Sequence, residues 1–435
     1  MNINKVIPFF SHCKHLKEIS KVITITNSKR LIGEELQKGY LNFYDKRYVQ
    51  PYVPIMASGP WILTNENKII YDCGGYGMLG LGHNPDSILK ALSKQQVMAN
   101  IMTPNESQKN FKDTIDKEIK PSYDKIVCLN SGSEVNTLAM RIANIHSEKK
   151  PVQVSLKGSF HGRTEMPASI SYSCRKIYEN NLEKYQKPQS TYFIEMNNNQ
   201  DLIDTFEIIK SNNEFPEITV IEPVMGEGNP GIEMKPDFYN LLRKITKETR
   251  GLLLVDSIQA GFRCKGELSI TKYPGFLDLE PPDMESFSKV INSGQFPLSV
   301  LALTEKTANI YNTGLYGNTM TTNPRALDVS TATFKEITTS VRENIVLSGE
   351  KLKKQFKLLE NKYKFIENVT GTGLLLAIHL EQHIDVIKIE NNLRKNGLNV
   401  IHGGKNALRF TPWFKINDDE INFIIHLLEN EFNKI

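Results

Sequence analysis

The sequence predicts an α/β protein that combines a mostly parallel sheet, flanked by helices, with a smaller α+β domain. Its 435 residues are too many for one compact core and suit two or three domains. Continuous apolar runs alternate with helical patterns through the middle of the chain, as in parallel sheets covered on both faces. After about residue 330 the pattern changes to long amphipathic helices and short strands, so we expect the smaller domain there.

Strand-like and helical stretches alternate between residues 125 and 256. The strand-like runs are nearly all apolar, which is typical of strands buried on both faces. The predicted elements are the strand 125–130, the helix 134–146, the strands 151–156 and 217–222, the helix 238–249 and the strand 251–256. A further apolar stretch, 297–303, has the length of another buried strand.

The last third of the chain predicts the smaller domain. Long helices are expected at 326–337 and 341–363, a strand region at 371–379, a helix near 386–397 and a closing helix from Asp418. We expect the segment 40–72 to pack with them. The predicted division is an N-terminal extension and small-domain segment (1–90), a large domain (91–330) and a C-terminal small domain (331–435). Residues 1–21, apolar and basic, are expected to serve in oligomer packing.

Composition and charge exclude several classes of protein. No apolar run approaches the ~20 residues that a membrane helix needs. The net charge of +4 is spread thinly, without the basic blocks of a nucleic-acid-binding surface. The five cysteines are scattered and form no CxxC pair, so we expect no metal site and a reducing, cytoplasmic location.

Three polar features follow the predicted strands, at the sheet edge where α/β proteins bind ligands. The turn 130–134 (Asn-Ser-Gly-Ser-Glu) leads from a strand into a helix, where backbone N–H groups and hydroxyls can hold a phosphate. Taken alone, such a turn is more often explained by simple helix capping.

The other two features are a carboxylate and a lysine. Asp256 ends an apolar strand, where a buried carboxylate needs a cationic partner such as a pyridinium N–H. A helix cap or salt bridge is the alternative. Lys289 precedes an apolar stretch, and desolvation there would lower its pKa and favour imine formation. Most lysines, by contrast, are solvated surface groups.

Six stretches in a fixed order carry a family resemblance. They are Asn130-Ser-Gly-Ser-Glu-Val-Asn136, Gly158-Ser-Phe-His-Gly-Arg-Thr164, Glu222-Pro-Val-Met-Gly-Glu227, Asp256-Ser-Ile-Gln-Ala-Gly261, Ser288-Lys-Val-Ile-Asn-Ser-Gly294 and Leu408-Arg-Phe-Thr-Pro412. From about Tyr71 to its end, the chain resembles the class III aminotransferases, the ornithine/4-aminobutyrate group. These enzymes use pyridoxal 5′-phosphate (PLP) on fold type I, which implies a mostly parallel seven-stranded sheet in the large domain.

The resemblance also implies which residues hold PLP. Lys289 would bind the cofactor covalently as a Schiff base and later move a proton, and Asp256 would pair with the ring nitrogen. The remaining implied contacts are Ser131, Gly132 and Ser133 around the phosphate, Phe160 stacked on the ring, His161 nearby, and Gln259 at the ring oxygen. Thr319 would reach the phosphate from the neighbouring subunit, which implies a homodimer with shared active sites.

Four further residues bear on the substrates. Arg163 and Arg409 match the positions at which this group grips carboxylates with a bidentate guanidinium. Glu227 matches a glutamate that masks the second arginine in one half-reaction and releases it in the other. Tyr76 lies where the family shapes its substrate pocket. Such a site would take an ω-amine donor and then a 2-oxo acid such as 2-oxoglutarate.

The chain departs from the family pattern in three places. Ser257 stands where the family has Glu after the ring aspartate. The small residues after the phosphate threonine are replaced by Met320, Thr321 and Thr322, and Gly-Gly before Pro297 becomes 294–296 (Gly-Gln-Phe). These changes remove no catalytic group, but they could reshape the donor pocket.

Rival functions remain at this point. A PLP racemase, epimerase or aminomutase would share the lysine and the aspartate, although the presence of both arginines with Glu227 favours an aminotransferase. A catalytically silent binding protein on the same fold is a second alternative. A Rossmann dehydrogenase would need a GxGxxG turn, which the chain lacks. The sequence does not select among ornithine, N-acetylornithine, lysine, 4-aminobutyrate and diaminobutyrate as donor.

Overall fold

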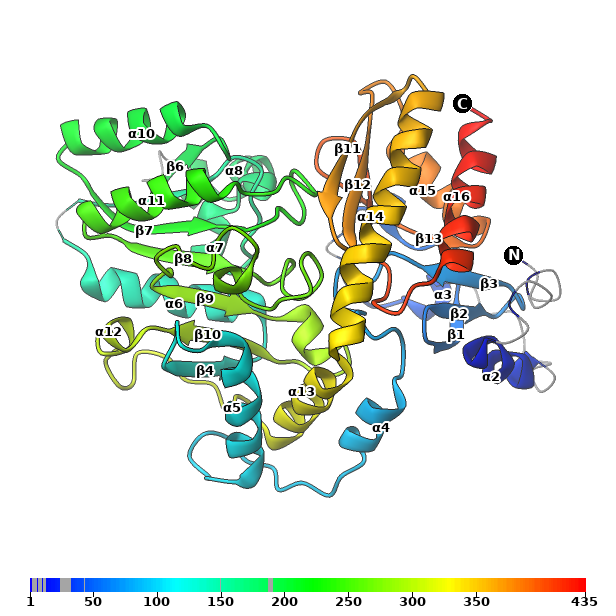
Figure 1. Ribbon diagram of the computed structural model, residues 1–435, viewed down its shortest axis with the longest axis horizontal. Helices are drawn as coiled ribbons and strands as arrows, with labels where there is room; N and C mark the ends of the chain where they lie inside the picture. The colour runs from blue at the N-terminus through cyan, green and yellow to red at the C-terminus, as the bar shows by residue number, and fades with distance from the viewer. Residues whose placement is uncertain are drawn as a thin grey trace.

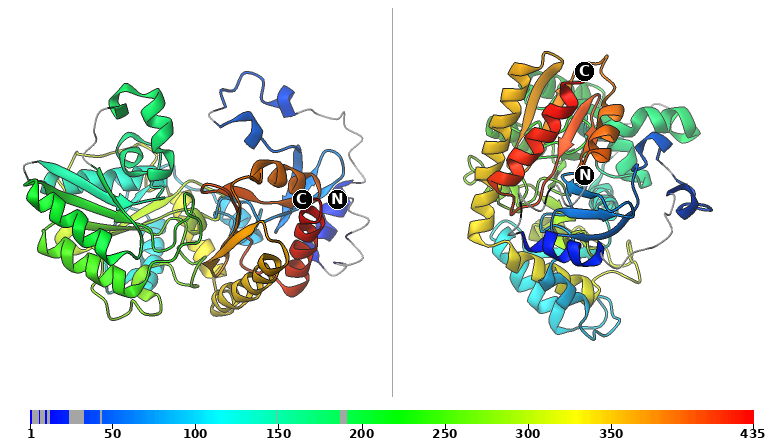
Figure 2. Two further views of the ribbon diagram at one scale, coloured as in Figure 1. Left: turned by 90° about the horizontal axis from the view of Figure 1, so that it is seen from above. Right: turned by 90° about the vertical axis from the view of Figure 1, so that its right-hand side faces the viewer.

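A computed structural model describes residues 1, 6, 10, 13–23, 33–42, 44–148, 150–186 and 191–435. These residues form two domains that lie side by side (Figure 1). The larger domain contains a seven-stranded sheet with helices packed around it. The smaller one holds both ends of the chain, as two further views show (Figure 2). No helix in the described part of the chain is long and apolar enough to cross a membrane.

The large domain is built on one mostly parallel sheet. In order across the sheet its strands are β4 (Lys125–Leu129), β10 (Ser299–Leu303), β9 (Met284–Phe287), β8 (Leu252–Asp256), β7 (Phe215–Ile221), β5 (Pro151–Leu156) and β6 (Thr191–Ile194). Only β10 runs antiparallel to its neighbours, and the strands from β9 to β6 pair in parallel. The predicted fold class is confirmed, and so are the predicted strands to within two residues at each end.

Alternating side chains of each strand fill two separate cores. In β8, Leu252 and Leu254 are buried against helix α6 (Gly132–His146). Leu253 and Val255 point to the opposite face and pack under α10 (Asn199–Ser211) and α11 (Pro236–Glu248). Because both faces are covered, all five residues of β8 are buried, which explains its continuous apolar sequence.

Shorter elements surround this sheet. They are α4 (Asp86–Leu92), α5 (Glu106–Ile119), α7 (Glu165–Ile170), η2 (Tyr172–Cys174), α8 (Arg175–Asn181), α9 (Glu183–Gln186), η3 (Ile270–Lys272), η4 (Lys289–Asn292), α12 (Glu305–Ala308) and α13 (Pro324–Glu336). Helix α13 packs against α4, α5 and η4. We propose that the chain divides near residues 90 and 330, with α13 at the second boundary.

The small domain combines both ends of the chain. One sheet has the order β1 (Pro54–Ser58), β2 (Trp61–Thr64), β3 (Ile69–Asp72) and β13 (Leu398–Asn399), and the other β11 (Ile366–Thr372), β12 (Leu375–Leu380), β15 (Ala407–Phe410) and β14 (Ile401–Gly403). The remaining elements are α2 (Lys14–Ile23), α3 (Gly33–Leu36), η1 (Lys46–Tyr48), α14 (Thr339–Lys362), α15 (Val386–Lys395) and α16 (Asp418–Phe432). Tyr71 pairs with Leu398 in parallel register, so the segment 40–72 packs with the C-terminal part as expected.

Two local predictions need refinement. The stretch 371–379 was expected to be one strand region, but Gly373 turns the chain there with a φ of +54°, and β11 and β12 form a hairpin. A positive φ is easily adopted only by glycine. Residues of α2, including Leu16 and Ile19, are buried in the chain's own core, which gives this segment a role within the subunit.

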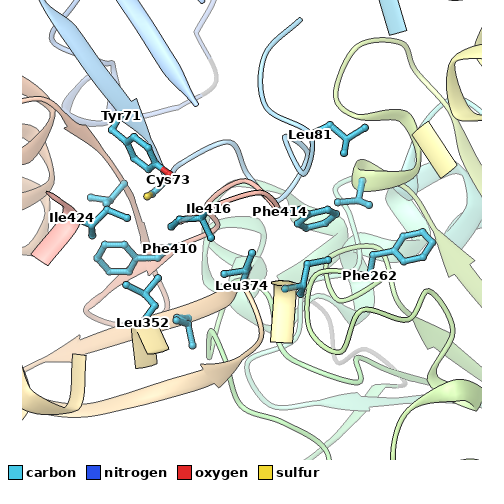
Figure 3. Close-up of a cluster of buried hydrophobic side chains, with 14 of the residues drawn as sticks. Tyr71, Cys73, Leu81, Phe262, Leu352, Leu374, Phe410, Phe414, Ile416 and Ile424 are labelled. Carbon is cyan, nitrogen blue, oxygen red and sulfur yellow. The ribbon is translucent and has the colours of Figure 1, made fainter. Parts of the chain in front are cut away.

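A single hydrophobic cluster joins the two domains (Figure 3). Phe262 comes from the large domain, whereas Leu352 of α14 and Phe410 of β15 come from the small one. Phe262 packs edge-on against Phe334 with ring centroids 5.5 Å apart. Since this shared core continues across the boundary, residues of the small domain are held at fixed positions beside the large sheet.

Gly349 offers a test of how tightly the long helix α14 packs. At an exposed helix position, alanine is more favourable than glycine by about 1 kcal/mol. A Cβ at position 349, however, would collide with the backbone carbonyl of Gly373. We therefore expect Gly349→Ala to lower the free energy of unfolding by about 1–3 kcal/mol in denaturant titrations. The control is Glu350→Ala at the next, exposed position, which should change stability by less than about 0.5 kcal/mol. A stabilised Gly349→Ala variant would contradict this packing.

Candidate active site

Five strands end at one edge of the large sheet, and the predicted site residues follow these ends. Two cavities lie there, of about 410 Å³ and about 700 Å³. Met78, Phe160 and Lys289 line both cavities. The smaller cavity is formed by loops of the large domain, and the larger one also has residues of the small domain in its wall. Lys289 is thus placed where a bound cofactor and a substrate could meet.

Lys289 follows β9 in a strained backbone conformation. Its φ of +50° is left-handed, which costs a non-glycine residue on the order of 1 kcal/mol. Burial, and then the positive charge of Arg409, lower the pKa of Lys289 to about 8. The amide oxygen of Gln259, oriented toward the two cations, accepts from Lys289 Nζ at 3.0 Å and from Arg409 Nη1 at 3.3 Å. The neutral, nucleophilic fraction of this amine near neutral pH is therefore larger than that of an ordinary lysine.

Asp256 ends β8 and is 4% exposed. Its Oδ2 accepts from Asn136 Nδ2 and faces His161 Nδ1, both at 2.9 Å, while Oδ1 accepts from the N–H of Ile258 at 3.1 Å. His161 is held in turn by Ser155, whose Oγ lies 3.2 Å from Nε2. These contacts hold a buried carboxylate at one orientation in the smaller cavity, ready to pair with a cationic ring N–H.

The N-terminus of α6 forms another wall of the smaller cavity. Ser131 caps the helix by accepting from the N–H of Glu134 at 3.3 Å. Ser131, Gly132 and Ser133 all line the cavity. A side chain at Gly132 would place its Cβ 2.6 Å from Ile258 Cδ1, so a larger residue here would require the Ile258 side chain to move. The start of a 15-residue helix with adjacent hydroxyls is suited to an anionic phosphate.

The smaller cavity fits PLP by this chain's own features. It combines a buried carboxylate, a lysine of lowered pKa and a phosphate-binding helix start around one space of about 410 Å³. The buried Oδ1 of Asn136, beside Asp256, has no hydrogen-bond partner in the described part of the chain. Phe160 lines the cavity as an aromatic surface for a planar ring. We propose that the PLP contacts expected from the sequence are made here.

The departure at Ser257 has a structural explanation. Ser257 Oγ donates to Glu285 Oε1 at 2.5 Å. Glu285 is fully buried, and its other oxygen accepts from Ser269 and from Tyr123 OH. Burial raises the pKa of Glu285. Position 257 thus lacks the carboxyl group that the family has there, but a carboxyl group lies beside it on the neighbouring strand β9. The sequence alone did not predict this pairing.

Of the other two departures, one lines the smaller cavity and the other lies outside both site cavities. Phe296 packs against the main core and lines the smaller cavity, so it adds bulk to the cofactor pocket. Thr321 and Thr322 line neither of the two site cavities but a separate one of about 640 Å³, together with Thr319. Met320 is half exposed.

Thr319 is the one predicted site residue outside both site cavities. It is exposed, and its backbone carbonyl accepts from Asn100 Nδ2 at 3.3 Å. Glu134 holds the loop before it, since Glu134 Oε1 accepts from Tyr316 OH at 3.1 Å and from Asn318 Nδ2 at 3.0 Å. The loop is therefore tied to helix α6 of its own chain, while Thr319 lines a cavity outside the candidate site.

The four predicted substrate residues all line the larger cavity: Tyr76, Arg163, Glu227 and Arg409. Arg409, on β15, is 2% exposed, and burial lowers its pKa. Its Nη1 donates to the carbonyl of Gly226, whereas its buried Nε has no partner in the described chain. No direct ion pair with Glu227 is present among the described residues, although the charge of Glu227 acts against the lowering of the Arg409 pKa.

Arg163 and Tyr76 occupy more open positions. The Arg163 guanidinium lies over the rings of Phe160 at 5.6 Å and Tyr44 at 5.7 Å. Such cation–π contacts orient the group and leave its N–H donors available to a carboxylate. Tyr76, with a φ of +52°, is 44% exposed at the cavity wall.

Sequence reasoning missed several residues of this region. Glu222, at the end of β7, is 2% exposed and accepts from the N–H groups of Phe160 and Gly226, both at 3.0 Å. Burial raises the pKa of Glu222 to about 7. Its position at a strand end was the available signal. Tyr52, Glu390, Arg394 and His402 also line the larger cavity, and no motif marks them.

Comparisons with known proteins agree with this geometry. Residues 43–432 match the aminotransferase class-III family. A LysW-aminoadipate semialdehyde/glutamate semialdehyde transaminase of Sulfurisphaera tokodaii is 30% identical over 74% of this chain and 82% of its own. The acetylornithine aminotransferase of Clostridium acetobutylicum is 29% identical over 83% of this chain and 91% of its own. The crystal structure of an ornithine aminotransferase from Toxoplasma gondii, 19% identical, superposes with a TM-score of 0.81 over 95% of this chain and 97% of that chain.

The fold and these cavities define a PLP-dependent enzyme of fold type I. The chain belongs to the class-III aminotransferases, the family whose pattern spans residues 43–432. The resemblance inferred from the six motifs is thereby confirmed, and aminotransfer with PLP follows from family membership. The racemase, aminomutase and non-catalytic alternatives are not favoured.

The lowered pKa of Lys289 predicts a pH effect on stability without cofactor. Since the folded pKa, about 8, lies below the unfolded value, the unfolded chain binds more protons between about pH 8 and pH 10. Stability should therefore rise with pH in this window. In Lys289→Met this contribution disappears, so the free energy of unfolding should exceed that of the wild type at pH 7 and the difference should shrink toward pH 10.

Denaturant titrations of the cofactor-free proteins at several pH values measure this effect. The matched control is Lys306→Met at an exposed position, which should follow the wild type throughout. A difference between Lys289→Met and the wild type that is constant with pH would show that Lys289 is not desolvated as described.

Proposed function

We propose that this aminotransferase moves the ω-amino group of an amino acid to a 2-oxo acid, with 2-oxoglutarate as the acceptor. The observation that carries the proposal is one cavity whose wall brings Arg163, Arg409 and the carboxylate of Glu227 together with Lys289. An ω-amino acid has one carboxylate remote from its reacting amine, whereas 2-oxoglutarate has two carboxylates. A site with two arginines, one of them influenced by Glu227, suits both in turn. Relatives named for acetylornithine and for aminoadipate semialdehyde support this class of donor.

Each residue has a chemical role in this proposal. Bound PLP supplies an aldehyde that takes up the amino group and a ring that withdraws electrons from the reacting carbon. Lys289 Nζ removes the proton from the amine-bearing carbon of the donor. In the second half-reaction it adds a proton to the carbon of the acceptor that receives the amino group. Asp256, fixed by Asn136 and His161, keeps a proton on the ring nitrogen. Gln259 Oε1 orients Lys289 Nζ from 3.0 Å.

The arginines orient the two substrates. The Arg163 guanidinium lies over two aromatic rings, and its N–H groups bind the carboxylate that donor and acceptor have in common. Arg409 is buried, so an unpaired charge there is costly and a second carboxylate is a favourable partner. Glu227 shares the cavity and serves as the alternative partner of Arg409 when the monocarboxylate donor is bound. Burial lowers the pKa of Arg409, and the same burial makes an anionic partner favourable in each half-reaction.

We propose further that the protein is a homodimer with shared active sites. Thr319 is exposed and lines a cavity other than the cofactor cavity of its own chain, which supports its assignment to the partner's phosphate site. The exposed apolar side chains of Ile101 and Met102 line the same cavity as Thr319. Val97 and Met98, which are also exposed and apolar, precede them in the sequence. Such a patch is typical of a subunit interface. The five free cysteines suit a reducing compartment, and we propose the cytoplasm.

The function is tested by supplying candidate donors singly to the purified, PLP-loaded enzyme with 2-oxoglutarate. We expect glutamate and an aldehyde product from one ω-amino acid in equal amounts. Lys289→Ala should lower turnover at least about 10³-fold, because the proton-transfer group is lost. A donor consumed without glutamate would indicate a mutase or racemase, and full turnover by Lys289→Ala would contradict the role of this lysine.

Arg409→Lys separates the two half-reactions. Lysine keeps the charge but loses the bidentate geometry, so the KM for 2-oxoglutarate should rise about 10- to 100-fold. The KM for the donor should change by less than about threefold, because Glu227 is the partner of Arg409 in that half-reaction. Steady-state kinetics with each substrate varied in turn measures both values. Equal effects on both would show that Glu227 does not alternate with substrate.

A further inference from the structure

Glu285 is a buried carboxyl group to which the proposed reaction assigns no role. It lies on β9, four residues before Lys289, and it is fully buried. Because side chains alternate between the two faces of a strand, Glu285 shares a face with Phe287, which belongs to the main hydrophobic cluster. Among the described residues no cation pairs with Glu285. A carboxyl group in such a place is costly unless hydrogen bonds satisfy it.

Four hydrogen bonds from the described residues satisfy this carboxyl group. Its Oε1 accepts from Ser257 Oγ at 2.5 Å and from the N–H of Ile270 at 2.9 Å. Its Oε2 accepts from Ser269 Oγ at 2.5 Å and from Tyr123 OH at 2.9 Å. A carboxylate has about four lone-pair positions, so the accepting capacity is fully used. Burial raises the pKa of Glu285, and the hydrogen bonds from Ser257 and Ser269 act against this rise.

These bonds join four segments of the large domain at one point. Besides β9 itself, the segments are the end of β8, the start of η3 and the chain before β4. Ser257 directly follows Asp256, the last residue of β8. Its N–H also donates to the carbonyl of Ser286 at 3.0 Å. Two adjacent residues of β9, Glu285 and Ser286, therefore bind the residue that follows Asp256.

The backbone of Lys289 depends on support of this kind. Its φ of +50° is unfavourable for a residue with a side chain, and such conformations persist only where surrounding contacts fix them. On the side of β10, Ser299 Oγ donates to Ser288 Oγ at 2.6 Å. On the side of β8, the support comes from the bond between Glu285 and Ser257. The strand that carries the lysine is therefore held from both neighbouring strands.

Asp256 has anchors of its own. Its carboxylate is bound by two side chains and by one backbone N–H, and none of these groups is a donor to Glu285. Asp256 would therefore keep its orientation if the bonds to Glu285 were lost. Lys289 would lose the contacts that hold its strand on the side of β8. The expected consequence is a less well-defined distance between the lysine and the aspartate.

We propose that Glu285 is a positioning residue, which fixes Lys289 with respect to Asp256 by holding the end of β9 against the end of β8. The inference rests on the proposed binding of PLP by these two residues, and it applies to any amino donor. Glu285 lines neither of the two site cavities, so it acts through the backbone that leads to Lys289. Its role is thus distinct from those of Glu222 and Glu227, which line the cavities.

Two forms of the cofactor separate this role from a general effect on stability. Pyridoxamine 5′-phosphate requires the phosphate site and Asp256, whereas PLP requires these and also a covalent bond to Lys289. The ratio of their dissociation constants therefore reports how well Lys289 is placed. Both constants are measured by calorimetry on the full-length protein freed of cofactor, for the wild type, Glu285→Ala and Glu285→Gln.

We expect Glu285→Ala to weaken the binding of PLP about 10-fold and that of pyridoxamine 5′-phosphate less than about threefold, because only PLP needs a correctly placed lysine. Glutamine has the same shape as glutamate, and the hydroxyl groups of Ser269 and Tyr123 can accept as well as donate. Glu285→Gln should therefore keep the network and bind PLP within about threefold of the wild type.

Glu217→Ala is the matched control. Glu217 is a buried glutamate near the start of β7, toward the edge of the same sheet that lies opposite the site. It accepts from Asn144 Nδ2 and from Gln153 Nε2, both at 3.2 Å. Its replacement should lower the free energy of unfolding, because two hydrogen bonds are lost, and should leave the ratio of the two dissociation constants unchanged.

The inference would be overturned by an unchanged ratio in Glu285→Ala, or by a Glu285→Gln variant that loses as much PLP affinity as Glu285→Ala. If Glu285→Ala does not fold, Ser257→Ala allows the same comparison. This variant removes one of the four donors, so it should change the ratio by about 2- to 5-fold. An unchanged ratio in Ser257→Ala would then overturn the inference.

A reference variant separates the inference from its premise. Lys289→Ala should weaken PLP far more than pyridoxamine 5′-phosphate, and equal weakening of both would overturn the inference together with the assignment of Lys289. If no ω-amine donor yields glutamate, the proposed function fails. The ratio of the two dissociation constants, which involves no amino donor, still decides whether Glu285 positions the lysine.

Discussion

The buried carboxylate of Asp256 is the group on which the arrangement of the active site depends. It ends a strand that is covered on both faces, and it accepts hydrogen bonds from α6, from the loop after β5 and from the turn after β8. Three elements are thereby fixed with respect to one charge. The same helix presents its N-terminus to the cavity, so the anchor for a ring and the anchor for a phosphate are parts of one rigid unit.

Contact between the domains determines the substrate side. Arg409 and Arg394 belong to the small domain, yet they share a cavity with Lys289 of the large domain. The hydrophobic cluster around Phe262, Leu352 and Phe410 holds these parts together. Because that core is continuous, the distance between the arginines and the lysine does not depend on a flexible hinge. Gln259, which contacts both Lys289 and Arg409, connects the two sides by hydrogen bonds.

Sequence patterns were sufficient for the sheet, and most of the residues predicted for the site line the two cavities at its edge. A strand that is buried on both faces, such as β8, is recognisable as a continuous apolar run. The polar residues that follow such strands meet at one edge of a parallel sheet. The hairpin at Gly373 was harder to locate, because β11 ends in Thr370-Gly-Thr372 and lacks the continuous apolar pattern of a strand that is buried on both faces. Contacts between distant positions were not accessible at all. The Ser257–Glu285 bond joins two strands, and nothing in either local sequence marks it.

The wall of the larger cavity carries more cations than carboxylates. Its wall contains the cations Arg163, Lys289, Arg394 and Arg409 but only the carboxylates Glu227 and Glu390. Glu390 is committed to Arg394 and His402. Glu227 alone is therefore available to compensate the other cations, and it does so without a fixed ion pair. That excess of positive charge suits the dicarboxylate acceptor that we propose, and Glu227 is the carboxylate with which such an acceptor would exchange.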